Sequence, residues 1–189
     1  MNPRLPARVG GLLLGAFVVA ERSLRHGESA RTLHAGADDD GTTRVVGGVF
    51  GAVLTFGPLL ARWRRGRLPT WAGWTGVGLM VGGLGLRLWS ARALGTHYTR
   101  TLRIEGDHVL AETGPYSQIR HPGYAGTMTM LVGYGLTLMS LPATVGIVVP
   151  VTWAYHRRIE AEEAMLAKGL GEPYLRYQDR TDRLIPKVY

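Results

Sequence analysis

The sequence predicts an all-α integral membrane protein with about five transmembrane helices. Five apolar runs without a charged residue lie along the chain, and most of its Lys and Arg residues gather at the ends of these runs. Basic residues at the ends of apolar runs are typical of membrane spans. The mean hydropathy of +0.02 is low for a membrane protein because the loops between the runs are crowded with charge.

Each apolar run is short for a membrane span. The runs are Val9 to Ala20, Val45 to Ala61, Trp71 to Leu86, Tyr124 to Ser140 and Ala143 to Tyr155. A bilayer-spanning helix needs roughly 20 residues, so flanking Arg, Trp or Tyr side chains must extend most runs at the interface. The first run, of 12 residues, fits either a short span or an interfacial helix. Glu21 and Arg22 follow it in place of a small-residue cleavage site, so we predict no signal peptide.

The excess of basic over acidic residues helps to predict which partners the chain binds. The 22 Lys and Arg residues against 14 Asp and Glu residues give a formal charge of +8, which in a soluble domain would indicate nucleic acid. Here the charge flanks apolar runs, and the sequence has no RNP-like motif, zinc-finger spacing or basic helical stripe. We therefore predict membrane lipids and no nucleic acid as partners. Cysteine is absent, which excludes disulfides and thiolate metal sites.

The last two runs predict both a hairpin and an orientation. Leu141-Pro142 alone separates them, which predicts a tight helical hairpin with its turn at these two residues. Because cytoplasmic loops accumulate Lys and Arg, the uncharged tip is expected outside the cytoplasm, and counting back places 16 Lys and Arg inside and 6 outside. One basic cluster falls outside and opposes this orientation: Arg62, Arg64, Arg65 and Arg67.

Three further patterns have simple interpretations. Two glycine pairs four residues apart, Gly47/Gly51 and Gly78/Gly82, are expected to let helix backbones approach closely. The glycines from Gly76 onward lack the G-x-G-x-x-G spacing and a preceding strand, so they predict no dinucleotide loop. The triple Asp at 38–40 is interpreted as part of a solvated polar loop, and we predict no metal site.

A polar connector between Ala91 and Arg120 carries the first chemically informative segment, THYTRTLRIEGDHVLAETGPYSQIR. It permits a short hairpin or extended segments across the membrane face. Pro122 fits the first turn of the next helix, so His121 is expected at or beside the N-cap, with Tyr124 roughly one turn further on. Two interpretations stay open: a helix cap with interfacial aromatic residues, or a helix N-terminus that faces an anionic or polar cofactor group.

The C-terminal tail, HRRIEAEEAMLAKGLGEPYLRYQDRTDRLIP, is the second such segment. Its first part predicts a helix that leaves the membrane, with Arg158 and Glu162 on one face and Glu163 on another. Gly169 and Gly171 are expected to end this helix, before a second short helical segment.

The two segments, in this order around a two-span hairpin, resemble the isoprenylcysteine carboxyl methyltransferase family and the related bacterial phospholipid and isoprenoid methyltransferases. The resemblance covers roughly Leu94 to Pro186 and rests on GPYSQIRHPGY and RIEAEEAMLAKGLGEPYLRY. It implies an S-adenosylmethionine pocket at the cytoplasmic face, formed by the connector and the tail, with a lipid entering sideways from the bilayer. The chain then divides into three N-terminal spans (1–90) and a catalytic region (91–189).

The resemblance also implies roles for individual residues. Arg158 and Glu162 correspond to the family's essential pair near the reacting carboxylate. The remaining positions are expected on the cofactor side. The backbone near Tyr98 and Leu110 is expected to close over the adenosine. The cofactor-side positions are His121, Tyr116, Tyr124, Tyr98, Leu110, Tyr174, Tyr177 and Arg183.

The predicted reaction is methyl transfer to the carboxylate of a lipophilic, isoprenoid-like acceptor at the inner surface of the cell membrane. A carboxylate is already ionised at neutral pH and needs no general base. Our hypothesis is that Arg158 aligns the acceptor oxygen while Glu162 fixes Arg158 or the cofactor's ammonium group. Two alternatives are N-methylation of a phospholipid amine, with Glu162 or His121 as base, and a non-catalytic membrane scaffold or transporter.

Overall fold

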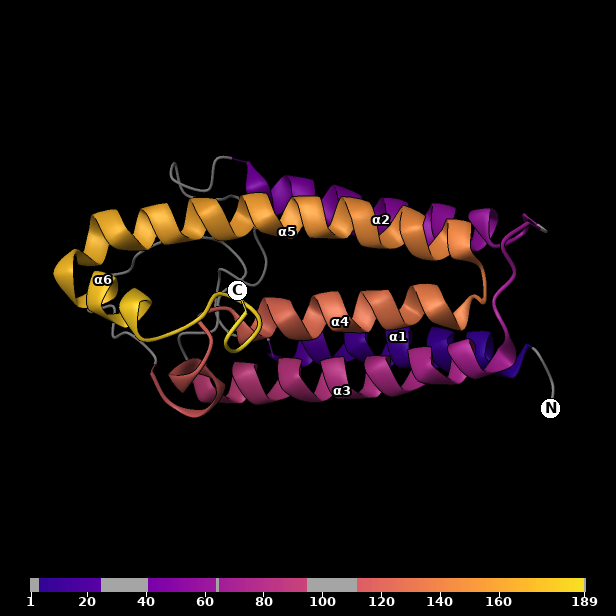
Figure 1. Cartoon of the computed structure of the whole chain (residues 1–189), viewed down its shortest axis with the longest axis horizontal. Helices are drawn as coiled ribbons and strands as arrows, with labels where there is room; N and C mark the ends of the chain where they lie inside the picture. The colour runs from indigo at the N-terminus through magenta and orange to yellow at the C-terminus, as the bar shows by residue number, and fades with distance from the viewer. Residues whose placement is uncertain (1–3, 25–40, 64, 95–111, 189) are drawn as a thin grey trace.

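The computed structural model describes residues 4–24, 41–63, 65–94 and 112–188, which form a helical bundle (Figure 1). The described part of the chain contains no strand-built sheet, so the all-α prediction is confirmed. Each of the five apolar runs lies largely within one long helix. The elements are α1 (Leu5–Leu24), α2 (Thr42–Leu60), α3 (Thr70–Leu94), η4 (Gly114–Ser117), α4 (Pro122–Thr137), α5 (Leu141–Leu170) and α6 (Glu172–Asp179).

The core of the bundle lies between α3, α4 and α5. Met80, Met130 and Ile147 are almost completely buried there. Helices α1 and α2 contribute Phe17 and Phe50, whose rings lie 6.0 Å apart between centroids. The helices therefore share one continuous core.

Large apolar side chains also point outward from the bundle. Nine of those on the described helices are more than half exposed: Leu12, Val19, Phe56, Trp71, Val81, Trp89, Leu141, Val149 and Trp153. By length and composition alone, α2 is the one helix among the described residues that could cross a membrane. Helix α4 has 16 residues, and α5 carries charge along its C-terminal half. The five predicted spans therefore stay a prediction.

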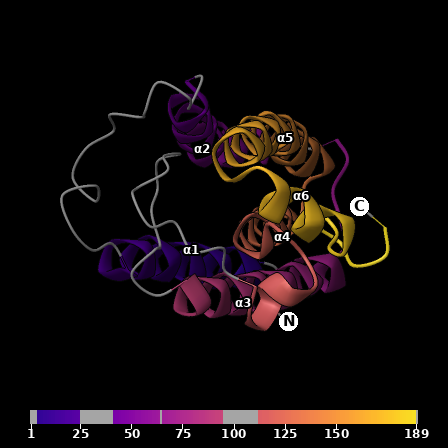
Figure 2. The same ribbon diagram turned by 90° about the vertical axis from the view of Figure 1, so that its left-hand side faces the viewer.

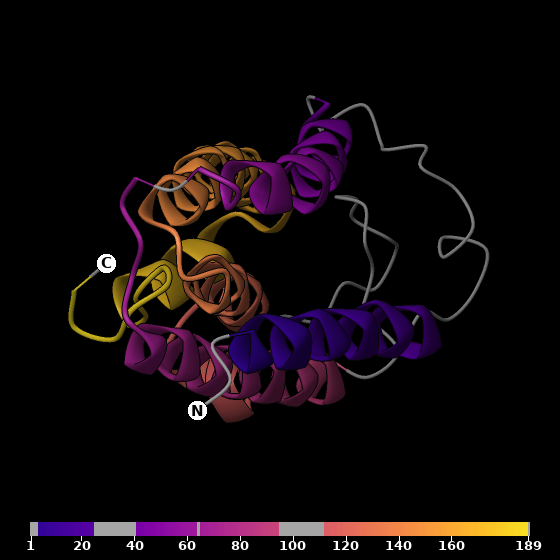
Figure 3. The ribbon, with the colours of Figure 1, turned by 90° about the vertical axis from the view of Figure 1, so that its right-hand side faces the viewer.

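The described segments that connect the helices lie at the two ends of the bundle. At one end, shown toward the viewer in Figure 3, segment 65–69 meets the hairpin tip. There Leu68 N donates to Met139 O at 3.0 Å, and Leu141 N donates to Gly66 O at 2.8 Å. The opposite end holds η4, the start of α4, the charged half of α5 and α6 (Figures 1 and 2). This sorting agrees with the predicted topology, which places segment 62–70 and the hairpin tip on one side.

The hairpin turn lies earlier than predicted. The chain turns at 138–140, and Leu141 and Pro142 already form the first turn of α5. Ser140 is the N-cap, and its Oγ accepts a hydrogen bond from Ala143 N at 3.4 Å. Proline fits this first turn because its missing N–H would have no intrahelical partner. Treating Pro142 as the turn was therefore wrong, because the residue starts a helix here.

Glycines seven residues apart allow α3 to pack closely on α4. A Cβ on Gly76 would lie 2.5 Å from Gly133 O, and a Cβ on Gly83 would lie 2.5 Å from Gly126 O. Seven residues make about two helical turns. Gly76 and Gly83 therefore lie on one face of α3, and Gly126 and Gly133 lie on one face of α4. The predicted role of the four-residue spacing is wrong at Gly51, Gly78 and Gly82, where an added Cβ would meet nothing within 4 Å.

Two adjacent glycines test this packing. We expect Gly83→Ala to lower the thermal midpoint in detergent, because the new methyl forces α3 and α4 apart at a cost of about 1–3 kcal/mol. Gly82→Ala is the matched control, since its methyl enters open space and alanine favours helix. Equal midpoints for the two variants would contradict the proposed helix contact.

Candidate functional site

His121 lies at the start of α4 among acidic side chains. It is the N-cap, as predicted, but its side chain makes no capping hydrogen bond. Its Nε2 lies 3.3 Å from Glu163 Oε1, and its Nδ1 lies 3.8 Å from Glu162 Oε2. The buried ring stacks on Tyr124 with 5.5 Å between centroids. Helix capping alone therefore does not account for this histidine.

Arg158 is a buried arginine held by hydroxyl groups from two other helices. Its Nε donates to Tyr124 Oη at 2.7 Å, and its Nη1 donates to Thr43 Oγ1 at 2.9 Å. Tyr124 Oη in turn donates to Glu162 Oε2 at 2.6 Å. The guanidinium carbon also lies 5.6 Å from the centroid of the Tyr124 ring. Tyr124 thus bridges the predicted catalytic pair, Arg158 and Glu162.

Glu163 is the acid on which the neighbouring cations converge. Its Oε1 accepts from Arg120 Nε at 2.8 Å, and its Oε2 accepts from Arg183 Nε at 2.9 Å. Its side chain is 6% exposed. Neither Arg120 nor Glu163 was predicted from the sequence as a site residue. The available signal was helical spacing: Glu163 follows the buried residues Tyr155 and Ile159 at four-residue steps.

These partners change the acidity of Glu163. Burial disfavours its charged form, but hydrogen bonds from His121 and Arg120 outweigh burial and lower the pKa from its usual value near 4.5 to about 2. The carboxylate is therefore ionised throughout the physiological range. It provides a permanent negative charge where α5 meets α4 and the tail.

Backbone hydrogen bonds join the end of the connector to the C-terminal tail. Arg120 N donates to Asp182 O at 2.8 Å, and His121 N donates to Arg183 O at 3.0 Å. Asp182 N donates back to Gln118 O at 3.1 Å. These bonds and the Glu163 ion pairs hold the tail against the start of α4.

The helix in the tail ends at one of the two predicted glycines. Gly171 has φ 61° and ψ −135°, a positive-φ backbone conformation that glycine adopts without a steric penalty. Gly169 lies inside α5, which continues to Leu170, so the predicted break at Gly169 is wrong. The reversal at Gly171 folds α6 back along the bundle (Figure 1).

Helix α6 turns two tyrosines inward. Tyr177 Oη donates to Tyr116 O at 2.7 Å. Burial raises the pKa of Tyr177 to about 12, so it is a neutral donor at physiological pH. Tyr174 is 1% exposed, and its Oη is a buried polar atom without a hydrogen-bond partner among the described residues. Leaving such a group unpaired costs about 1–3 kcal/mol, so this hydroxyl is a suitable contact for a bound polar group.

The structure brings most predicted site residues to one end of the bundle. Tyr98 and Leu110 fall in 95–111, outside the described residues. In the described ranges, no cluster of three or more His, Cys, Asp or Glu side chains is arranged to hold a metal. The predicted residues that lie at this end are Tyr116, His121, Tyr124, Arg158, Glu162, Tyr174, Tyr177 and Arg183.

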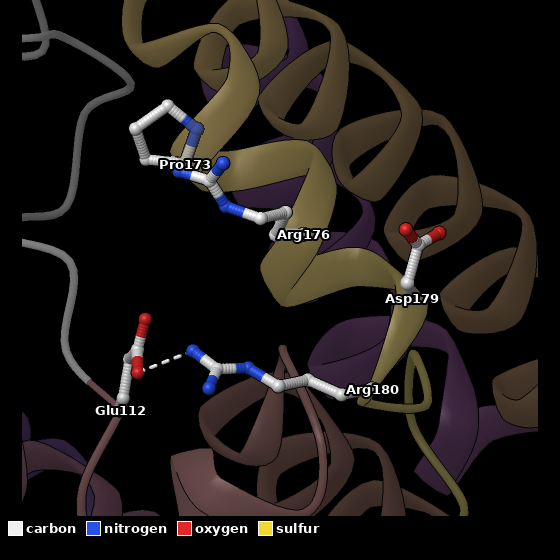
Figure 4. Close-up of a pocket in the computed structure, with 5 residues that line it drawn as sticks. All are labelled: Glu112, Pro173, Arg176, Asp179 and Arg180. Atoms are coloured by element: carbon white, nitrogen blue, oxygen red, sulfur yellow. Dashed lines mark ion pairs between the residues drawn. The ribbon is translucent and has the colours of Figure 1, made fainter.

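A separate pocket lies on the other side of α6 (Figure 4). It has a volume of ≈ 450 Å³, and Arg180 forms an ion pair with Glu112 across it. The predicted site residues do not line this pocket. Its lining consists of Glu112, Pro173, Arg176, Asp179 and Arg180.

Comparison with known proteins matches the same part of the chain. Residues 76–168 fit the model of the isoprenylcysteine carboxyl methyltransferase (ICMT) family. Over these residues the chain is similar to this family. The matched ICMT segment contains His121, Tyr124, Arg158, Glu162 and Glu163, and it ends before α6. The resemblance predicted from the two sequence motifs is therefore confirmed.

Individual ICMT relatives cover the chain to different extents. The protein-S-isoprenylcysteine O-methyltransferase of Saccharomyces cerevisiae is 35% identical over 94 residues, which are 49% of this chain and 38% of the relative. The Dictyostelium discoideum enzyme of the same name is 30% identical over 122 residues, 61% of this chain and 50% of the relative. The chain thus spans half or less of the length of these two relatives.

A solved structure supports the fold. The eukaryotic intramembrane Ras methyltransferase ICMT superposes with a TM-score of 0.61 at 21% sequence identity. The match covers 91% of this chain and 60% of the solved one. The likeness at this identity establishes a shared helical membrane fold.

Proposed function

We propose that this chain is an integral membrane methyltransferase that uses S-adenosylmethionine to methylate the carboxylate of a lipophilic, isoprenoid-like acceptor. The observation that carries the proposal is the buried Arg158, linked through Tyr124 to Glu162 at one end of an apolar bundle. An arginine fork is suited to binding a carboxylate. The names of the curated relatives support O-methylation as the reaction.

Arg158 has the role of aligning the acceptor. The ionised carboxylate needs no base, so orientation supplies much of the acceleration. The partners seen for Arg158 Nε and Nη1 are neutral hydroxyls, Tyr124 and Thr43. These two acceptors hold Arg158 Nε and Nη1 in place without adding a formal charge of their own. Glu162 fixes the arrangement through the Tyr124 hydroxyl.

The polar residues beside Arg158 suit the methyl donor. When bound, S-adenosylmethionine supplies a sulfonium methyl group, which forms a C–O bond with the acceptor while the C–S bond breaks and a neutral thioether leaves. Tyr174 Oη is available as a hydrogen-bond donor, and the carboxylate of Glu162 suits a cationic ligand. His121 lies between Glu162 and Glu163. Tyr116, Tyr177 and Arg183 shape the surrounding wall.

Surface chemistry supports the proposed membrane placement. We place α1 to α5 across the bilayer, with the site at the cytoplasmic boundary. Outward-facing apolar side chains support contact with lipid. Exposed Trp63 and Trp71 lie at the opposite end, where tryptophans are typical of the membrane interface. The distribution of Lys and Arg supports the orientation, with 16 of 22 on the site side.

Donor binding and acceptor chemistry test the proposal. Purified protein in detergent should bind radiolabelled S-adenosylmethionine and transfer label to a farnesylated cysteine derivative with a free carboxylate. A methyl ester releases its label as methanol in base, whereas an N-methyl group does not. Label that resists base and appears in phosphatidylethanolamine would contradict carboxylate methylation. Failure to bind the donor would reject the enzyme and favour a scaffold.

His121 should contribute to donor binding. We expect His121→Ala to weaken the affinity for S-adenosylmethionine by about tenfold in calorimetry, because it removes a ring that touches both acids. His156→Ala is the control, since that side chain is 54% exposed on the same bundle. Unchanged donor affinity in the His121 variant would reject a role in donor binding and indicate a purely structural role for this residue.

A further inference from the structure

Thr43 is a residue of α2 that contacts Arg158. It is in the first turn of the helix, and its side chain is 3% exposed. Threonine at a helix start often caps the backbone, but α2 begins at Gly41 with no side-chain cap. The Thr43 hydroxyl instead accepts a hydrogen bond from Arg158 Nη1 at 2.9 Å, across 115 residues of sequence.

We propose that Thr43 is a positioning residue for methyl transfer and that it sets the orientation of the Arg158 guanidinium. The proposal rests on the function proposed above. It extends the catalytic region of the chain, 91–189, to the first turn of an N-terminal helix. Neither sequence motif contains this threonine.

Two contacts together fix the guanidinium. The hydrogen bond from Nε to Tyr124 Oη fixes one point of the planar group. The second bond, from Nη1 to Thr43, adds another fixed point from another helix. Because α2 lies beside α5 (Figures 1 and 2), both anchors belong to the folded bundle. The arginine is therefore oriented before an acceptor binds, which reduces the ordering cost at the reaction step.

The chemical type of residue 43 matters as well as its place. A carboxylate here would form an ion pair with Arg158 and compete with the acceptor carboxylate. A hydroxyl accepts the hydrogen bond and stays neutral. Threonine also fills the buried space with a methyl group, so valine matches its shape and lacks only the hydroxyl. Serine keeps the hydroxyl and lacks only the methyl.

This pair of substitutions separates orientation from packing. In detergent-purified protein we expect Thr43→Val to reduce kcat for ester formation by about tenfold or more, with donor affinity within twofold of wild type. Thr43→Ser should stay within about threefold of wild type. Thr55→Val is the control, because the Thr55 hydroxyl bonds to Gly51 O within α2, away from the site. Thermal midpoints are measured for every variant.

The outcomes distinguish this inference from the proposed function. Wild-type turnover in Thr43→Val, or equal losses in the Val and Ser variants, would overturn the positioning role while leaving the methyltransferase intact. If Thr43→Val does not fold, the comparison of Thr43→Ala with Thr43→Ser decides in the same way. An inactive wild-type protein that also fails to bind the donor would remove the proposed function and this inference together.

Discussion

Arg158→Lys is expected to lower kcat/KM for the acceptor by at least a hundredfold. Lysine keeps the positive charge but replaces the planar fork with a single ammonium, so it cannot hold Tyr124, Thr43 and a carboxylate in the same geometry. Loss of aligned, buried hydrogen bonds of about 3 kcal/mol in the transition state corresponds to a rate change of this size. Initial rates of base-labile methyl incorporation measure the effect.

The neighbouring residue is a matched control for this change. Arg157 is exposed, and its guanidinium carbon lies 5.7 Å from the centroid of the Trp153 ring. We expect Arg157→Lys to retain near-normal turnover. Near-normal turnover in Arg158→Lys as well, with unchanged thermal midpoints, would reject Arg158 as the acceptor-binding residue.

Glu163→Gln is expected to cause the largest loss of stability. The change leaves Arg120 and Arg183 beside a neutral amide in a largely buried place. Breaking a buried ion pair by removing one partner typically costs about 3–5 kcal/mol. The thermal midpoint in detergent should therefore fall by several degrees, and trypsin should cleave faster at the tail basic residues. Glu160→Gln is the control, since Glu160 is 59% exposed on the same helix.

The same carboxylate predicts an acid-sensitive stability. The folded pKa of Glu163 is about 2, below its usual value near 4.5. A lowered folded pKa stabilises the fold fully above the unfolded value, and this contribution is lost as the pH falls from about 4.5 toward 2. Wild type should lose stability through that window, and Glu163→Gln should lose less. Identical acid profiles for the two proteins would contradict the role of Glu163.

Local features of the chain were predictable because they depend on neighbouring residues. The five apolar runs form helices, and Pro122 starts α4 after His121. Gly171 ends α5 because the chain reverses through positive φ there. The motifs also placed His121, Arg158 and Glu162 together, and the 3.8 Å separation of the His121 and Glu162 side chains agrees with that prediction. Helix starts, helix ends and motif residues are properties of short segments.

Contacts between distant segments were not predictable. Arg120 and Glu163 are separated by 43 residues, and Arg158 and Thr43 by 115. The rotation of each helix about its axis decides whether such side chains meet. The same rotation selects Gly83, and excludes its neighbour Gly82, for contact with α4. Neither spacing nor residue type shows which glycine faces the partner helix.

The amino-acid order by itself therefore determined which segments are helical, where several of them begin and end, and which two motifs resemble those of the family. The tertiary structure alone decided how Glu163 holds the tail and how Thr43 and Tyr124 hold Arg158. The physical reason is that hydrogen bonds between helices depend on packing angles set by the whole core, whereas helix formation depends on side chains within a few turns.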